Sequence, residues 1–237
     1  MPGRSTPGRK RESYLGQHFL ANGALARRLA HDADIAPSDL VVEFGAGPGV
    51  LTSAVAERGA RVLALELDPQ FVAELVRRFR GSDRVTVFGG DALAFPLPAT
   101  RFRVFANPPF NRTSAILHRL LDDPSRGLVR ADLVVQWQVA RARTQAGNGA
   151  PLDLVGAAWG PWWVFRRGRR LPATLFRPSP SVDAAVLIVE RRASALLPEH
   201  DAARFHEFVR SQFGNGSANH SVEDWSRLFR ARPGEPA

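Results

Sequence analysis

The chain has 237 residues, of which 44% are apolar and none is cysteine, and it carries a formal net charge of +9. This length and composition predict one large α/β domain, or one domain with a small appendage, and exclude disulfides, thiolate metal sites and a cysteine nucleophile. No segment has the apolar length of a membrane span or of a secretory signal, so we expect a cytoplasmic protein that contacts no membrane.

The first predicted segment is a flexible basic arm over residues 1–13, which are polar and contain proline and glycine. A short helix follows over 25–33, and strands then alternate with helices. The predicted strands are 40–44, 60–67, 84–88 and 102–106, and the predicted helices between and after them are 51–58, 69–79 and 114–121. A further strand within 131–140 runs into a helix. This alternation predicts an α/β fold with a doubly wound, mostly parallel, Rossmann-like sheet.

The last third of the chain has a different pattern. Residues 161–176 place an Arg-Gly run between apolar stretches, which predicts a strand, a turn and a returning strand. Residues 181–192 predict a final strand, whose apolar run indicates a central position in the sheet. Aromatic residues at helical spacing after Pro198 predict a helix that packs on one face. We therefore expect an α/β domain over 14–192 and a small, mainly helical C-terminal region over 193–237.

A glycine turn joins the first strand of the sheet to its helix in the stretch VVEFGAGPGVLT. Gly45 and Gly47 lack a Cβ, so a ligand can approach the backbone there. The spacing differs from the dinucleotide fingerprint because Val50 replaces the third glycine, and such a turn alone is also compatible with simple packing. Glu66 closes the next strand, where a carboxylate accepts both hydroxyls of a ribose. Asp91 follows the third strand and can accept from an adenine amine, so the pattern predicts a nucleoside ligand.

The corner NPPF, residues 107–110, ends the fourth strand, because proline has no backbone N–H and fixes φ. An exocyclic base amine is a poor nucleophile, since its lone pair is delocalised into the ring. In a methylating site, the Asn107 side-chain oxygen and the Pro108 carbonyl can accept hydrogen bonds from the two N–H groups of this amine. Phe110 would then stack on a base held out of its helix. With a sulfonium methyl donor, positioning and electrostatics supply most of the rate, and no strong general base is needed.

The positive charge favours a polyanionic partner such as RNA. Nearly all of this charge is arginine, which suits planar contacts to phosphate and stacking on bases better than lysine does. We predict RNA contacts at Arg112, beside the NPPF corner, and at two clusters of basic residues. These clusters are Arg9, Lys10 and Arg11 in the arm, and Arg166, Arg167, Arg169 and Arg170 further along the chain.

Six motifs, in family order, make the chain resemble the rRNA adenine-N6 methyltransferases, which include the Erm macrolide-resistance enzymes and the KsgA-type enzymes. The motifs are GQHFL, EFGAGPGVLT, LELD, GDAL, NPPF and FRPSPSVDAAVL. The resemblance implies a Rossmann-like methyltransferase fold and an S-adenosylmethionine site formed by His18, Leu20, Gly45, Gly47, Glu66, Asp91 and Asn107. It places Asn107, Pro108 and Phe110 at the target adenine. His18 departs from the asparagine that is usual in the family, which leaves its side-chain contact open.

Within the family, the Arg-rich stretch WWVFRRGRRLPATLFRPSP resembles the Erm proteins of antibiotic producers, and the tail after Arg192 is short for a KsgA-type C-terminal domain. The implied reaction is methylation of one adenosine in 23S rRNA at the macrolide site, by a monomer without a metal. Two alternatives stay open: a KsgA-like enzyme for 16S rRNA, and a nucleic-acid-binding relative that has lost catalysis. A DNA adenine methyltransferase would need a target-recognition domain, and Val50 disfavours a nicotinamide oxidoreductase.

Overall fold

The computed structural model describes residues 17–144, 153–213 and 220–232. The predicted basic arm, with Arg9, Lys10 and Arg11, lies outside the described residues. None of the helices formed by these residues is long and apolar enough to cross a membrane.

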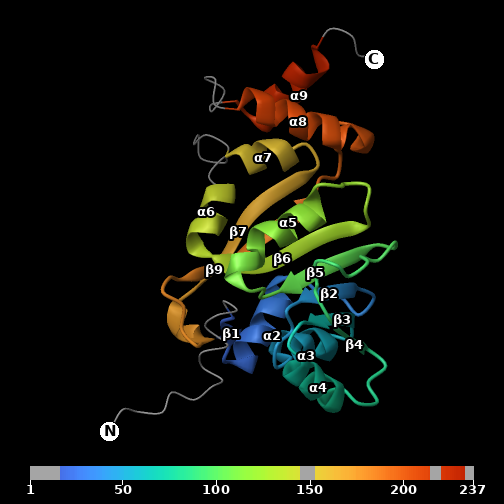
Figure 1. Cartoon of the computed structure of the whole chain (residues 1–237), viewed down its shortest axis with the longest axis vertical. Helices are drawn as coiled ribbons and strands as arrows, with labels where there is room; N and C mark the ends of the chain where they lie inside the picture. Colours follow the sequence, from blue (N-terminus) through green and yellow to red (C-terminus); the bar gives the residue numbers. More distant parts are fainter. Residues whose placement is uncertain (1–16, 145–152, 214–219, 233–237) are drawn as a thin grey trace.

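A seven-stranded sheet forms the centre of the molecule, with the strand order β4-β3-β2-β5-β6-β9-β7. The first five strands in this order are parallel to their neighbours, whereas β9 is antiparallel to both β6 and β7. The bounds are β2 Leu40–Phe44, β3 Arg61–Glu66, β4 Val85–Gly89, β5 Phe102–Ala106, β6 Leu128–Gln136, β7 Trp163–Leu171 and β9 Ala184–Arg191. The prediction of a doubly wound, mostly parallel sheet is therefore confirmed, and β9 is an interior strand as its apolar run indicated (Figure 1).

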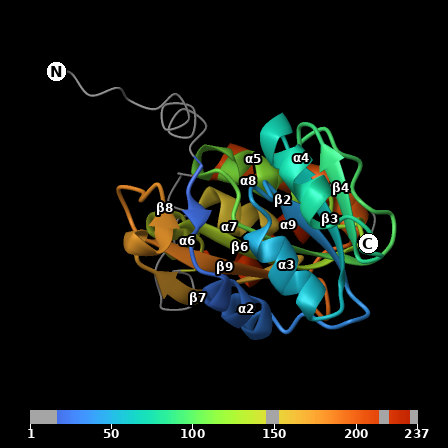
Figure 2. The same cartoon turned by 90° about the horizontal axis from the view of Figure 1, so that it is seen from below.

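Helices cover both faces of the sheet, so its inner strands β2, β5, β6 and β9 are largely buried on both sides (Figure 2). One core cluster lies against α2 and α3, and Val41 and Val62 belong to it. The larger cluster lies against α5 to α9, and Val42 and Leu133 belong to it. The helices are α2 Gly23–Asp32, α3 Val50–Glu57, α4 Pro69–Arg78, α5 Thr113–Leu121, α6 Trp137–Thr144, α7 Leu154–Trp159, α8 Ala202–Gln212 and α9 Val222–Arg230.

The predicted strand-turn-strand unit over 161–176 is wrong. The Arg-Gly run lies inside one continuous strand, β7, which is nine residues long. Gly168 sits at an irregularity of the pairing between Arg167 and Arg170, where a Cβ would come within 3.2 Å of Ile188. The glycine therefore serves packing against β9 and makes no turn. The chain reverses later, through Pro172 and the short helix η3, Ala173–Leu175.

The C-terminal helices α8 and α9 stack on α7 at one end of the molecule (Figure 1). Phe205 of α8 and Trp225 and Phe229 of α9 belong to the same core cluster as Leu133 and Leu187 of the sheet. The described part of residues 193–237 thus shares one core with the sheet. The domain boundary at residue 192 stays a prediction.

Candidate active site

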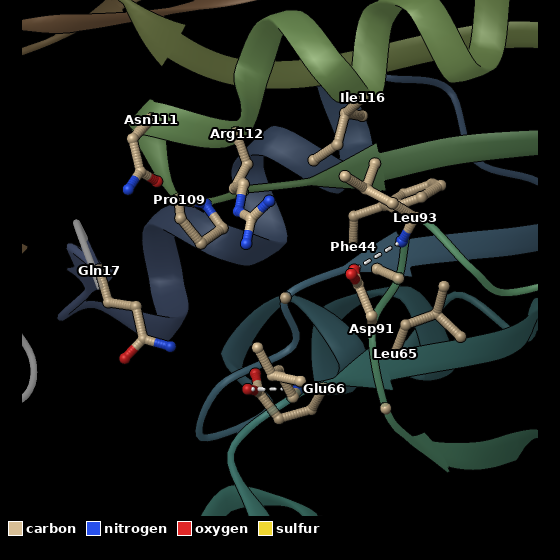
Figure 3. Close-up of a pocket in the computed structure, with 14 residues that line it drawn as sticks. Gln17, Phe44, Leu65, Glu66, Asp91, Leu93, Pro109, Asn111, Arg112 and Ile116 are labelled. Atoms are coloured by element: carbon tan, nitrogen blue, oxygen red, sulfur yellow. Dashed lines mark hydrogen bonds between the residues drawn. The ribbon is translucent and has the colours of Figure 1, made fainter. Parts of the chain in front are cut away.

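The carboxyl ends of β2, β3 and β4 and the corner after β5 surround a cavity of about 310 Å³ (Figure 3). Its walls combine apolar side chains with two carboxylates, Glu66 and Asp91. The apolar side chains include Phe44, Leu65, Leu93 and Ile116. The sequence predicted that Gly45, Glu66 and Asp91 would meet at this edge, because parallel strands present their carboxyl ends together. The structure brings all three of these residues to the cavity wall.

Glu66 is buried and is held by three backbone N–H groups. Its Oε2 accepts from Gly47 at 2.7 Å, and its Oε1 accepts from Leu67 and Asp68, both at 2.8 Å. A carboxylate offers about four acceptor positions. Glu66 therefore fixes the glycine turn to the end of β3 and keeps roughly one acceptor position for a hydroxyl in the cavity.

Asp91 follows β4 and lines the cavity (Figure 3). Its Oδ1 accepts the backbone N–H of Leu93 at 2.9 Å, which fixes the orientation of the carboxylate. The Oδ2 atom has no hydrogen bond within the part of the chain that the structure describes. It is therefore available to a donor in the cavity, such as an adenine amine.

The two predicted glycines of the turn have different surroundings. Gly45 lines the cavity, at a φ of +75°. Gly47, at a φ of +52°, lies under the ring of Phe19, and a Cβ there would come within 2.4 Å of that ring. Gly47 therefore admits the N-terminal segment to the site and places its N–H on Glu66, whereas Gly45 faces the cavity.

The short strand β1, Phe19–Leu20, pairs with β8, Phe176–Arg177, and brings residues near the N-terminus to the corner after β5. The Asn107 side-chain Nδ2 donates to the His18 carbonyl at 2.7 Å. Asn107 Oδ1 is buried and has no hydrogen-bond partner among the described residues. An acceptor left in this state costs about 1–3 kcal/mol, so it marks a place where an external donor is expected.

The structure shows which contacts the His18 side chain makes at the position where the family usually has asparagine. Its Nδ1 donates to the carbonyl of Pro178 at 2.8 Å, and its ring lies 5.3 Å from the ring of Phe110. Phe176 contacts Phe110 edge-on, at 6.4 Å between ring centres. The His18 side chain therefore positions Phe110, and its backbone carbonyl positions Asn107. The other predicted residues nearby, Leu20 and Pro108, are buried beside the glycine turn and in the corner.

Glu43, in β2, is a buried carboxyl beneath the glycine turn to which sequence reasoning gave no role. Burial raises its pKa from the usual 4.5 to about 8, and the nearby Glu66 acts in the same direction. The Thr52 hydroxyl donates to Glu43 Oε2 at 2.6 Å and opposes the rise in pKa. At neutral pH Glu43 is therefore mainly protonated, and it supports the turn without adding a charge.

Arg112, which was predicted to contact RNA, lines the cavity beside Pro109 and Ile116 (Figure 3). Gln17 and Asn111 also line it, and sequence reasoning missed both. The signal for them was available, because Gln17 belongs to the GQHFL motif and Asn111 directly follows NPPF.

The four arginines predicted as a basic cluster lie together on β7, and all four are exposed. Three of them pair with acids of the chain: Arg166 with Glu190, Arg169 with Asp32 at 2.9 Å, and Arg170 with Asp183 at 2.8 Å. Arg167 lies over the ring of Trp137. The four arginines are therefore close together on one strand, but most of their charge is balanced within the chain.

Comparison with known proteins identifies the family to which this site belongs. The family model for ribosomal RNA adenine dimethylase matches residues 8–219. The chain belongs to this family. Its members are S-adenosylmethionine-dependent methyltransferases, so the protein is an enzyme that uses this cofactor. The cavity fits the cofactor, because it offers apolar walls, an acceptor position on Glu66 and one on Asp91.

Several relatives are named as rRNA methyltransferases or resistance proteins. The chain is 36% identical over 230 residues to the mycinamicin-resistance protein MyrB of Micromonospora griseorubida, which covers 92% of this chain and 72% of the relative. It is 39% identical over 186 residues to a ribosomal RNA small subunit methyltransferase A of Deinococcus radiodurans, which covers 76% of this chain and 61% of the relative. Among solved structures, the 23S rRNA methyltransferase ErmE superposes with a TM-score of 0.73 at 28% identity, covering 91% of this chain and 85% of ErmE.

Proposed function

We propose that this protein methylates the N6 amine of one adenosine in 23S rRNA and thereby confers resistance to macrolide-type antibiotics. The observation that carries the proposal is the buried Asn107 Oδ1, which has no partner among the described residues and lies beside the cofactor cavity. A primary amine on a base offers the N–H donor that this oxygen lacks.

Asn107, Pro108 and Phe110 of the NPPF corner each have a separate role in the proposed reaction. The His18 carbonyl holds the Asn107 amide by its Nδ2, so that Oδ1 stays available to one N–H of the target amine. The carbonyl of Pro108 accepts the second N–H, and the two acceptors together favour a pyramidal nitrogen with an available lone pair. Phe110, supported by His18 and Phe176, stacks on the flipped adenine.

S-Adenosylmethionine supplies a methyl group bound to a cationic sulfur, so the reaction needs orientation more than a strong base. Glu66 and Asp91 would hold its ribose and adenine, with Gly45 at the turn between them and the corner. Leu20 and Gly47 would support this arrangement from beneath, through the packing of the N-terminal strand on the glycine turn.

Support for the large-subunit target comes from the relatives. The structural match to ErmE, which is named as a 23S rRNA methyltransferase, extends over more than nine-tenths of this chain, and so does the resemblance to MyrB, which is named as a mycinamicin-resistance protein. The match to the small subunit enzyme of Deinococcus radiodurans is shorter, although its identity is slightly higher. We therefore favour 23S rRNA over 16S rRNA as the proposed substrate. The protein would act as a cytoplasmic monomer, without a metal, on naked or assembling large-subunit RNA.

The test is to map modified adenosines by primer extension and mass spectrometry on rRNA from cells that express the protein. We expect one N6-methylated adenosine in 23S rRNA and a raised tolerance to macrolides. Cells that express Asn107→Ala at the same level provide the control and should show neither. A new modification confined to 16S rRNA, or no modification at all, would overturn the proposal.

A further inference from the structure

The edge strand β7 carries its arginines in an arrangement that an unbroken strand does not allow. Arg167 lies opposite Leu187 of β9, and Arg170 lies opposite Ala185, so three steps along β7 match two steps along β9. Successive residues of a strand point to opposite faces, so three regular steps would place the two arginines on opposite faces. The irregularity at Gly168 restores the register, so Arg167 and Arg170 project on the same face.

Both side chains reach the indole ring of Trp137, the first residue of α6. The guanidinium carbon of each arginine lies 4.7 Å from the ring centre. The backbone N–H of Trp137 donates to the backbone carbonyl of Asp183 at 2.9 Å, which fixes the start of the helix. A guanidinium over an aromatic face is attracted by the ring quadrupole, so this ring restricts two flexible cations.

The two cations differ in what else they contact. The Asp183 carboxylate accepts from Arg170 and from the backbone N–H of Ala173 at 3.0 Å. The Ala173 N–H and then the Arg170 guanidinium lower the pKa of Asp183. Arg170 is thus neutralised locally and helps to close the segment 172–183, which carries Phe176 and Pro178 to the target corner.

The charge of Arg167 is not balanced by an acidic side chain of the described residues. Arg167 is exposed, and the described part of the chain places no carboxylate within 4 Å of it, whereas Arg166 and Arg169 each pair with an acid. Its position is also suitable, because Trp137 follows β6, the strand next to β5, which leads to Asn107. An oriented guanidinium near the target corner can donate two hydrogen bonds to a phosphate.

We propose that Arg167, oriented by Trp137, contacts a phosphate of the RNA strand that carries the target adenosine. Trp137 acts as a positioning residue, because it reduces the conformational freedom that Arg167 loses on binding. Arg166 and Arg169 already pair with Glu190 and Asp32, so they contribute little. The inference rests on the proposed function, since it takes RNA as the substrate, and it narrows the predicted basic cluster to one contact.

The experiment measures the dissociation constant of a 23S rRNA transcript as a function of salt concentration, with Arg167→Ala and the neighbouring Arg169→Ala as matched variants. We expect Arg167→Ala to weaken binding about tenfold at low salt and to reduce the slope of log K against log salt by about 0.9. We expect Arg169→Ala to stay within twofold of the wild type, with an unchanged slope. Circular dichroism confirms that both variants fold.

Trp137→Leu tests the positioning role. It keeps the charge of Arg167, so the salt slope should change little while affinity falls several-fold. Arg167→Ala should then cost less in the Trp137→Leu background than in the wild type, because the two residues act as one unit. Equal costs in the two backgrounds would remove Trp137 from the proposal.

An unchanged salt slope in Arg167→Ala, or an equal loss in Arg169→Ala, would overturn the assignment of the phosphate contact. These results differ from a failure of the proposed function. In that case the wild-type protein would methylate 16S transcripts and not 23S transcripts. In that case the same titration on the methylated transcript tests Arg167 independently.

Discussion

The side chain of Asn107 shows what one residue gains from the fold. Its Nδ2 is satisfied by the carbonyl of His18, 89 positions away in the chain, and its Oδ1 is buried without a partner among the described residues. The sequence predicted Asn107, Glu66 and Asp91 because each ends a strand at one edge of the sheet. It could not predict which atoms of these side chains the backbone already uses.

Arg112 illustrates the same limit, and its position on the cavity wall gives a prediction. Because the guanidinium faces the space between Pro109 and Ile116, we expect it to pack on the cofactor's adenine (Figure 3). Arg112→Ala should weaken S-adenosylmethionine binding about fivefold in isothermal titration calorimetry without RNA. Its effect on the salt slope of RNA binding should be small. An unchanged cofactor affinity together with a reduced salt slope of RNA binding would instead support the RNA contact predicted for Arg112 from the sequence.

At the scale of elements, the glycine turn between β2 and α3 contains a carboxyl that makes stability depend on pH. The folded protein keeps the proton of Glu43 up to about pH 8, whereas its usual pKa is 4.5. The folded state therefore binds more protons than the unfolded chain between these values. This contribution to stability is complete below about pH 4.5 and is lost as the pH rises towards 8.

Glu43→Gln removes this titration and keeps the shape of the side chain. Relative to the wild type, the free energy of unfolding of Glu43→Gln, and with it the melting temperature, should rise as the pH increases from 5 to 8, the free energy by up to about 1.4 kcal/mol per pH unit. Differential scanning calorimetry across this range provides the measurement. Parallel curves for the two proteins would show that Glu43 does not carry the proton.

Most elements could be predicted from local pattern, and the exceptions depend on long-range contacts. The alternation of strands and helices predicted β2 to β5 and α3 to α5 to within one residue of their observed bounds, whereas β6 begins three residues before the predicted strand. β7 was misread because the role of Gly168 depends on Ile188 of β9. Helix α9 was not predicted, although Ser221 and Asp224 form a capping box that marks its start.

At the scale of the whole molecule, the C-terminal helices and the sheet share one hydrophobic core. The ring of Phe229 lies 5.3 Å from that of Phe205 and 5.6 Å from that of Phe208. Such contacts between distant segments cannot be read from sequence, which indicated only that one face of a helix packs on something. A shared core implies cooperative unfolding of the described structure.

Phe229→Ala tests this cooperativity. We expect the free energy of unfolding to fall by about 3–5 kcal/mol in a single transition. The neighbouring Leu228→Ala is the matched control, because Leu228 is 43% exposed, and it should cost less than about 1 kcal/mol. Two separate transitions, with cofactor binding lost only in the second, would instead support an independent domain over 14–192.

The central claim is that Asn107 Oδ1 receives the target amine, and the single-turnover rate of methyl transfer by Asn107→Ala tests it most directly. Removing one such acceptor should lower the rate at least about 100-fold. Calorimetry should show S-adenosylmethionine affinity within about tenfold of the wild type, so that the loss is assigned to the reaction itself. A rate within a few-fold of the wild type would contradict the account.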